Sequence, residues 1–155
     1  MKKTVIFDLD GTLADITLRR TLATDATTGR MDWDIFFDPK NIDLDMPNTP
    51  VIKMAQMLHD QGFEITICSG RSDKTKDVTI DWLNQHNVPF DILHMRPSSR
   101  GHHWHFMPDD ALKQHWLDNS IDKNNVFAVF DDRQQVVDMW RDNGLTVFQV
   151  DKGDF

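Results

Sequence analysis

The sequence predicts an α/β fold in which five parallel strands lie between layers of helices. Short runs of β-branched and aromatic residues alternate with longer stretches of helical period, a pattern typical of parallel strands joined by crossover helices. The chain has 155 residues, of which 39% are hydrophobic and 27% charged, which is enough to bury a core without disulfides. We therefore expect one domain over residues 1–155.

Five apolar runs have the length and composition of strands. They are residues 4–8, 64–69, 92–95, 126–130 and 146–150. Helical periodicity covers residues 50–61, 74–86, 109–119 and 134–143. The first of these helices places Val51, Ala55 and Leu58 on one stripe and is followed by Gly62, a typical C-terminal cap.

Residues 14–48 interrupt this alternation. They contain Gly29 and Pro39 together with the aromatic residues Trp33, Phe36 and Phe37, and they are too many for an ordinary loop between a strand and a helix. The segment follows the first strand, at the sheet edge where ligands bind in such folds. We expect a small cap or lid. The alternative is an ordered loop that its aromatic residues anchor.

Charge and cysteine usage restrict the class of protein. A net charge of −8 disfavours tight, sequence-independent binding to nucleic acid. The single cysteine, Cys68, lies in an apolar run, so it is expected to be buried and it fits a reducing compartment. No run reaches membrane-spanning length and no signal peptide is recognisable. We expect a soluble cytoplasmic protein with no membrane partner, in the host cytoplasm if the source is viral.

The strongest motif is Asp8-Leu9-Asp10-Gly11-Thr12 at the end of the first strand. Residues two apart on a strand share a face, so Asp8 and Asp10 are expected to meet, and converging carboxylates repel one another unless a cation neutralises them. Mg²⁺ prefers such oxygen ligands. Gly11 permits a tight turn, and Thr12 offers a hydroxyl and an N–H to phosphate oxygens.

This motif resembles the first signature of the haloacid dehalogenase superfamily, whose members share a Rossmann-like sheet and pass through an aspartyl-phosphate. Further signatures follow at the ends of the expected strands. Ser69, with Gly70 and Arg71, resembles the second, which binds the phosphoryl group. Lys113 resembles the third, a cation that holds the phosphoryl group and the nucleophile together.

Asp131 and Asp132 resemble the acidic fourth signature, which completes the metal site. The resemblance implies a phosphoric monoester hydrolase in which Asp8 is the nucleophile and Asp10 is first the general acid and then the general base. It also implies Mg²⁺, bound by Asp8, by the backbone carbonyl of Asp10 and by Asp131, with Asp132 acting through water. Thr12, Ser69 and Lys113 would then hold the phosphoryl oxygens.

A closer resemblance covers most of the chain. Residues 130–141 and 153–155 resemble the 3′-phosphatase domain of phage polynucleotide kinase-phosphatases. It implies a substrate with a terminal 3′-phosphate, on a polynucleotide end or a nucleotide. Arg19 and Arg71 match two arginines that contact substrate there, and Asp109 matches a further acidic site residue. Arg96 is an additional candidate because it lies at the end of the third expected strand. No Gly-rich nucleotide-binding motif of a kinase occurs.

Two other functions stay open at this point. A phosphatase for free 5′-nucleotides suits the acidic charge, and a non-enzymatic binding protein could retain the fold, although the intact set of Asp and Lys residues argues against it. The cluster of His102, His103 and His105 lacks the further ligands of a zinc site, so we expect a loop that contacts solvent or substrate. Trp33 or Trp104 could stack on a nucleobase, but packing within the protein is the favoured interpretation.

Overall fold

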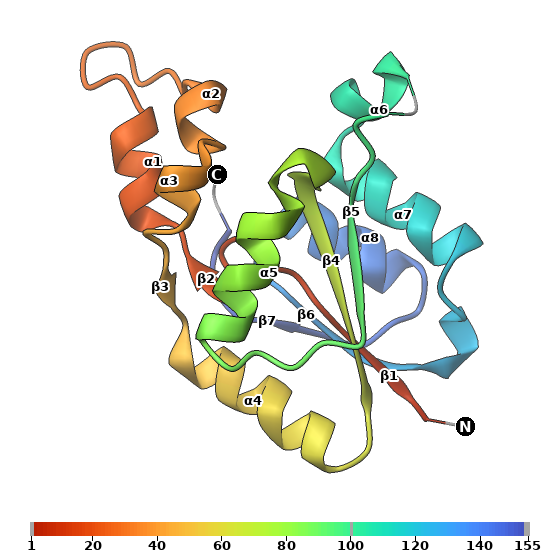
Figure 1. The fold of residues 1–155 in the computed structure, drawn as a ribbon. Helices are drawn as coiled ribbons and strands as arrows, with labels where there is room; N and C mark the ends of the chain where they lie inside the picture. Colours follow the sequence, from red (N-terminus) through yellow and green to blue (C-terminus); the bar gives the residue numbers. More distant parts are fainter. Residues whose placement is uncertain (1, 100, 154–155) are drawn as a thin grey trace.

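The computed structural model describes residues 2–99 and 101–153, with the side chain of His102 outside this set. Its centre is a parallel five-stranded sheet in the order β5-β4-β1-β6-β7 (Figure 1). The strands are β1 (Thr4–Phe7), β4 (Glu64–Ser72), β5 (Ile92–Arg96), β6 (Val126–Asp131) and β7 (Val147–Gln149). The predicted fold class is confirmed.

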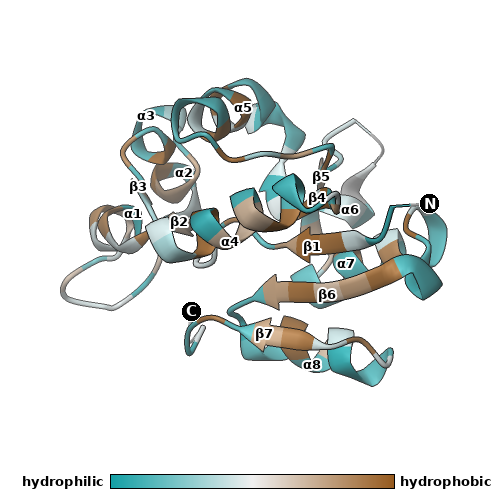
Figure 2. Ribbon diagram, turned by 90° about the horizontal axis from the view of Figure 1, so that it is seen from below, coloured by the Kyte–Doolittle hydropathy of each residue, from teal (hydrophilic) through white to brown (hydrophobic). Residues whose placement is uncertain are grey.

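Strand β1 lies in the middle of the sheet and is buried on both faces. Its side chains alternate between two separate hydrophobic clusters, because successive residues of a strand point to opposite sides. Val5 and Phe7 belong to one cluster, and Ile6 belongs to the other. In Figure 2 the strands β1, β6 and β7 accordingly stand out as hydrophobic.

Two pairs of helices cover the two faces of the sheet. The cluster around Val5 and Phe7 also contains buried residues of α4 (Thr49–Asp60) and α5 (Lys76–Gln85). The cluster around Ile6 contains residues of α7 (Asp109–Asn119) and α8 (Gln134–Asp142). Gly62 follows the C-cap of α4 with a φ of 94°, as expected for a helix stop.

Strand β4 and the segment after β5 differ from the sequence prediction. Strand β4 continues past Ser69, because Ser72 pairs with Arg96 after a shift in register. A one-turn 3₁₀ helix, Asp73–Thr75, precedes α5, and another, Lys123–Asn125, precedes β6. The prediction of a loop around the histidines is wrong, because helix α6 (His102–Phe106) forms there. It forms because Trp104 anchors it in the second hydrophobic cluster.

Residues 14–48 fold into a compact excursion beyond the carboxyl ends of the strands (Figure 1). It contains α1 (Thr17–Ala23), α2 (Trp33–Phe36) and α3 (Pro39–Ile42), and an antiparallel ribbon of β2 (Ala14–Asp15) with β3 (Met46–Pro47) closes its base. Asp32 and Asp38 cap the two short helices by accepting backbone N–H groups. A role as a cap over substrate stays a prediction.

The aromatic residues of the excursion contact one another, and Phe36 and Phe37 also pack in the first hydrophobic cluster. Phe36 is buried, whereas Trp33 has 58% of its surface exposed and stacks on Phe37. The buried position of Cys68 is as predicted, and burial raises the pKa of its thiol to about 12. No helix in the described part of the chain is long and apolar enough to cross a membrane.

Candidate active site

The carboxyl ends of β1 and β6 bring together the strongest predicted residues. Asp8 directly follows β1, Asp131 ends β6, and Lys113 reaches both from α7. The Lys113 ammonium lies 2.7 Å from Asp8 Oδ1 and 3.1 Å from Asp131 Oδ2. All three side chains are almost fully buried. The buried lysine is therefore in direct contact with Asp8, and its role in holding the nucleophile stays a prediction.

Asp8, Asp131 and Asp132 form a group of carboxylates suited to a metal ion. Their oxygen atoms lie within 4.8 Å of one another, and they are the one such group among residues 2–99 and 101–153. Burial, reinforced by the charge of Asp131, raises the pKa of Asp8, and burial also raises the pKa of Asp132. Three carboxylates against one ammonium leave an excess of negative charge that a divalent, oxygen-binding cation would neutralise.

The turn after β1 brings Thr12 and Gly11 against this group. The Thr12 hydroxyl lies 3.3 Å from Asp8 Oδ2 and 3.1 Å from Asp132 Oδ1. Gly11 has a φ of 85°, and a Cβ atom there would clash with the carboxylate of Asp132. The glycine of the motif thus permits both the turn and the close approach of Asp132.

Asp10 faces a different environment from Asp8. Its Oδ1 atom accepts hydrogen bonds from Arg19 Nη2 at 2.6 Å and from Arg71 Nη2 at 2.5 Å. Burial alone would raise the pKa of Asp10, but the charges of Arg71 and Arg19 outweigh burial and hold that pKa well below its usual range. Asp10 is not a member of the carboxylate group formed by Asp8, Asp131 and Asp132, and its carboxylate is bound by the two arginines instead. The expectation that Asp8 and Asp10 meet at one point stays a prediction.

Both arginines are buried and fully engaged with the protein. Arg19 donates to Asp45 from Nε and Nη2 and lies over the ring of Phe36, 4.5 Å from its centroid. Arg71 donates from Nη1 to the hydroxyl of Thr79 and from Nη2 to Asp45. Asp45, which the sequence analysis missed, thus sits between them. Its burial raises its pKa to about 6 despite the neighbouring arginines.

A separate polar network surrounds Ser69 and Gly70 of the second signature. The buried Ser69 hydroxyl accepts the backbone N–H of Arg71, and a Cβ at Gly70 would clash with Asp109. Asp109 in turn pairs with Arg96 at 2.6 Å and with Arg133 at 2.9 Å. Arg96 also donates to the backbone carbonyls of residues 70, 104 and 107. Its contacts connect the loops around the site, and its binding of substrate stays a prediction.

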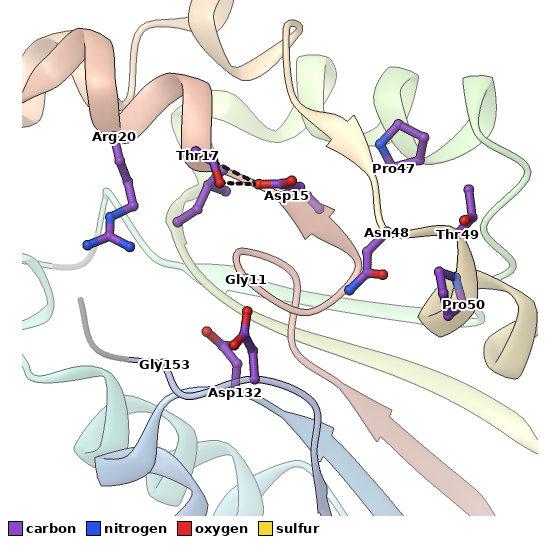
Figure 3. A pocket seen from close by; sticks show the side chains of 13 residues that line it. Gly11, Asp15, Thr17, Arg20, Pro47, Asn48, Thr49, Pro50, Asp132 and Gly153 are labelled. Atoms are coloured by element: carbon purple, nitrogen blue, oxygen red, sulfur yellow. Dashed lines mark hydrogen bonds between the residues drawn. The ribbon is translucent and has the colours of Figure 1, made fainter.

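A cavity of about 350 Å³ opens beside the turn after β1, at Gly11 (Figure 3). Its lining includes Gly11 and Asp132, the β2 to α1 connection with Arg20, the segment from Pro47 to Pro50 at the start of α4, and Asp151 and Gly153 near the end of the chain. Asn48 supports this wall, since its side chain donates to the carbonyl of Thr12 at 2.9 Å. Of the three carboxylates grouped above, Asp132 borders this cavity.

Two supporting residues escaped the sequence analysis for different reasons. Trp140 donates its indole N–H to Asp131 Oδ2 at 3.1 Å, yet in the sequence it is simply an apolar residue of a helical stripe. Asp45 lies in the excursion, where no periodicity indicates which side chains turn inward. A buried tryptophan usually donates its indole N–H to a hydrogen-bond acceptor. A polar partner for Trp140 could therefore be inferred once α8 had been placed.

Comparison with known proteins identifies the family of the chain. A family model described as "Polynucleotide kinase PNKP phosphatase domain" matches residues 2–155. A protein of Autographa californica nuclear polyhedrosis virus, named for polynucleotide kinase and RNA ligase activities, is 34% identical over 159 residues. This match covers 96% of the present chain but only 19% of the viral protein.

Solved structures extend the comparison. A chain from a Pnkp1/Rnl/Hen1 complex aligns with a TM-score of 0.79 and 32% identity, over 100% of this chain and 48% of that one. A hydrolase of the haloacid dehalogenase-like family from Streptococcus pneumoniae has a TM-score of 0.64 at 15% identity, over 96% of this chain and 84% of that one, and shows the shared fold. The chain therefore belongs to the family of polynucleotide kinase phosphatase domains, which are phosphoric monoester hydrolases of the haloacid dehalogenase type.

Proposed function

We propose that this chain is a Mg²⁺-dependent phosphatase that removes a 3′-phosphate from polynucleotide ends or nucleotides through an aspartyl-phosphate. One observation carries the proposal. The carboxylate of Asp8 is held by Lys113 at 2.7 Å beside Asp131 and Asp132, while the carboxylate of Asp10 is held apart by two arginines. Two aspartates in such different environments suit two different roles.

Asp8 acts as the nucleophile in this mechanism. One of its carboxylate oxygens attacks phosphorus, and the bond from phosphorus to the leaving oxygen breaks as the aspartyl-phosphate forms. Lys113 keeps Asp8 oriented and neutralises part of the charge on the phosphoryl group. The Thr12 hydroxyl, next to Asp8, and the Ser69 hydroxyl supply hydrogen bonds to the phosphoryl oxygens.

Asp10 moves the protons. The arginines keep Asp10 ionised in the free protein, so in the first step it takes the proton of a singly protonated phosphoryl group and passes it to the leaving oxygen. In the second step it takes a proton from the water that hydrolyses the aspartyl-phosphate, which releases phosphate and restores Asp8, and it then loses that proton to solvent. Asp10 Oδ2 suits this task, because it accepts one long bond, 3.2 Å from Arg71 Nε, whereas Oδ1 accepts three.

Asp8, Asp131 and Asp132 would hold Mg²⁺, together with the backbone carbonyl of Asp10. The oxygen-only donor set and its excess negative charge fit a hard divalent cation. When bound, the ion supplies positive charge to the phosphoryl oxygens and to the attacking carboxylate.

The relatives support the substrate assignment. The viral relative is named for polynucleotide kinase and RNA ligase, and a further solved chain, 32% identical, comes from a structure described as the Pnkp1/Rnl/Hen1 RNA repair complex. We extend to this chain the inference that the phosphate lies at the end of a nucleic acid. The net charge of −8 favours a second candidate, hydrolysis of free 5′-mononucleotides, because a long polyanion is repelled by such a surface.

The test is release of inorganic phosphate by the wild type and by Asp8→Asn in the presence of Mg²⁺. The substrates are a 3′-phosphorylated oligonucleotide and matched 3′- and 5′-mononucleotides. We expect the wild type to prefer the 3′-phosphorylated oligonucleotide and Asp8→Asn to be inactive. Preference for the 5′-mononucleotide would establish the second candidate instead, and full activity of Asp8→Asn would exclude Asp8 as the nucleophile.

A further inference from the structure

Asp45 lies where the excursion returns to the catalytic centre. It follows α3 and immediately precedes β3, and only 1% of its side chain is exposed. Its Oδ1 atom accepts Arg19 Nε at 2.9 Å, and its Oδ2 atom accepts Arg19 Nη2 at 2.8 Å. This two-bond fork fixes both the position and the plane of the Arg19 guanidinium.

The same two nitrogen atoms serve Asp45 and Asp10. Arg19 Nη2 and Arg71 Nη2 each contact both Asp10 Oδ1 and Asp45 Oδ2. The cluster therefore holds two carboxylates and two guanidiniums with balanced charge, and of the two carboxylates Asp45 is the one that lies outside the turn after β1. Without Asp45, both guanidiniums would have Asp10 as their one carboxylate partner among these four side chains.

The backbone of Asp45 is fixed independently of the cluster. Its carbonyl accepts the indole N–H of Trp82 at 3.0 Å, and its N–H donates to the carbonyl of Ile42 at 3.1 Å. Trp82 is a buried residue of α5. Helix α5 also supplies Thr79, which accepts Arg71 Nη1 at 3.0 Å. A rigid core helix therefore determines where Asp45 stands and, through it, where the arginines stand.

We propose that Asp45 is a positioning residue for the proton-transfer step, which acts on Asp10 by holding Arg19 and Arg71. This inference rests on the proposed function, in which Asp10 protonates the leaving oxygen. General acids act only from a well-aligned position, and small displacements reduce their effect. With Asp45 in place, the arginines make three hydrogen bonds to Asp10 Oδ1 and one, from Arg71 Nε at 3.2 Å, to Oδ2, so Oδ2 is the oxygen better suited to exchange a proton with the leaving group.

The test exploits the dependence of general acid catalysis on the leaving group. A 3′-phosphorylated oligonucleotide releases an alkoxide that must be protonated, whereas p-nitrophenyl phosphate releases a stable phenolate that needs little help. For Asp45→Asn we expect about a 10- to 100-fold loss of kcat with the oligonucleotide and less than about a 3-fold loss with p-nitrophenyl phosphate. The control is Asp43→Asn, an exposed residue of the same turn, which should match the wild type on both substrates.

Three outcomes separate the inference from the proposed function. Equal losses on the two substrates, or no loss on either, would overturn the role of Asp45. Asp8→Asn, measured in parallel, reports on the proposed function itself. If this variant keeps the activity of the wild type, both the proposed function and the role of Asp45 are overturned.

If Asp45→Asn fails to fold, as judged by circular dichroism, Trp82→Phe tests the role of Asp45 instead. It keeps the charges but removes the anchor of the Asp45 backbone, and it should show a smaller loss with the same selectivity, whereas an unchanged ratio overturns the role.

Discussion

Lys113 lies between Asp8 and Asp131 and contacts both carboxylates from within the protein. Burial by itself would lower the pKa of Lys113, but Asp131 and Asp8 raise it far above its ordinary value. The ammonium is therefore charged at neutral pH, where it offsets repulsion within the aspartate group.

The first prediction concerns this ammonium. Lys113→Met leaves buried carboxylates without their cation, so we expect a loss of about 3–5 kcal/mol in the free energy of unfolding at neutral pH. Part of this loss should return with saturating Mg²⁺. Urea denaturation with and without Mg²⁺ measures both effects. The control is Lys123→Met, an exposed lysine, and equal stability of the two variants would contradict the structural role of Lys113.

The second prediction concerns pH and metal binding. Burial and the charge of Asp131 raise the folded-state pKa of Asp8 above its ordinary value, so the folded protein binds this proton more tightly than the unfolded chain. The contribution of Asp8 to stability therefore falls as pH rises from about 4 through the raised pKa. Mg²⁺ binds only the ionised form, so its stabilising effect should grow over the same range. Melting temperatures with and without Mg²⁺ at pH 5 and pH 7.5 test this, and a pH-independent difference is the adverse result.

The third prediction separates backbone strain from crowding at a glycine. Gly11 and Gly62 have φ angles of 85° and 94°, but only Gly11 has atoms in the space of a Cβ. Replacement of either by alanine should cost about 1–2 kcal/mol in stability because of the left-handed backbone. Gly11→Ala should in addition displace Asp132 and reduce phosphate release at least 10-fold, an order-of-magnitude expectation for a misplaced metal ligand. Equal activity of the Gly11 and Gly62 variants would refute the effect of crowding at Gly11.

The fourth prediction concerns support of the metal site by Trp140. Loss of the N–H that donates to Asp131 should raise the Mg²⁺ concentration for half-maximal activity about 10-fold in Trp140→Phe, because groups behind the ligands tune metal affinity. The matched control is Trp116→Phe, since Trp116 is buried in the same hydrophobic cluster and stacks on His94. A Mg²⁺ titration of both variants settles the question, and identical curves count against Trp140.

The sequence predicted the sheet and its covering helices because their signals are local. Alternation, strand length and glycine stops can be read within a dozen residues, and the structure places β1, α4 and α7 within a few residues of the predicted ranges. The ends of elements were less certain, since the extension of β4 to Ser72 depends on its pairing with Arg96 of another strand.

Asp45 and α6 mark the limit of such inference. Asp45 contacts Arg19 across 26 positions and Trp82 across 37, and no local pattern distinguishes it from the solvated aspartates around it. Helix α6 has only five residues, and burial of Trp104 against α7 decides its conformation. Tertiary contacts determined both features, which is why they required the structure.

The central position of β1 also governs how a new chain becomes active. The strand that carries Asp8 pairs with β4 from Glu64 onward and with β6 from Val126 onward, so a ribosome produces it long before either neighbour. Contacts so distant along the chain form slowly, and until they form, an apolar strand needs shelter from aggregation. A nascent chain therefore has no catalytic centre until residues 126–132 have been made and have joined the sheet, which ties activity to completion of the fold.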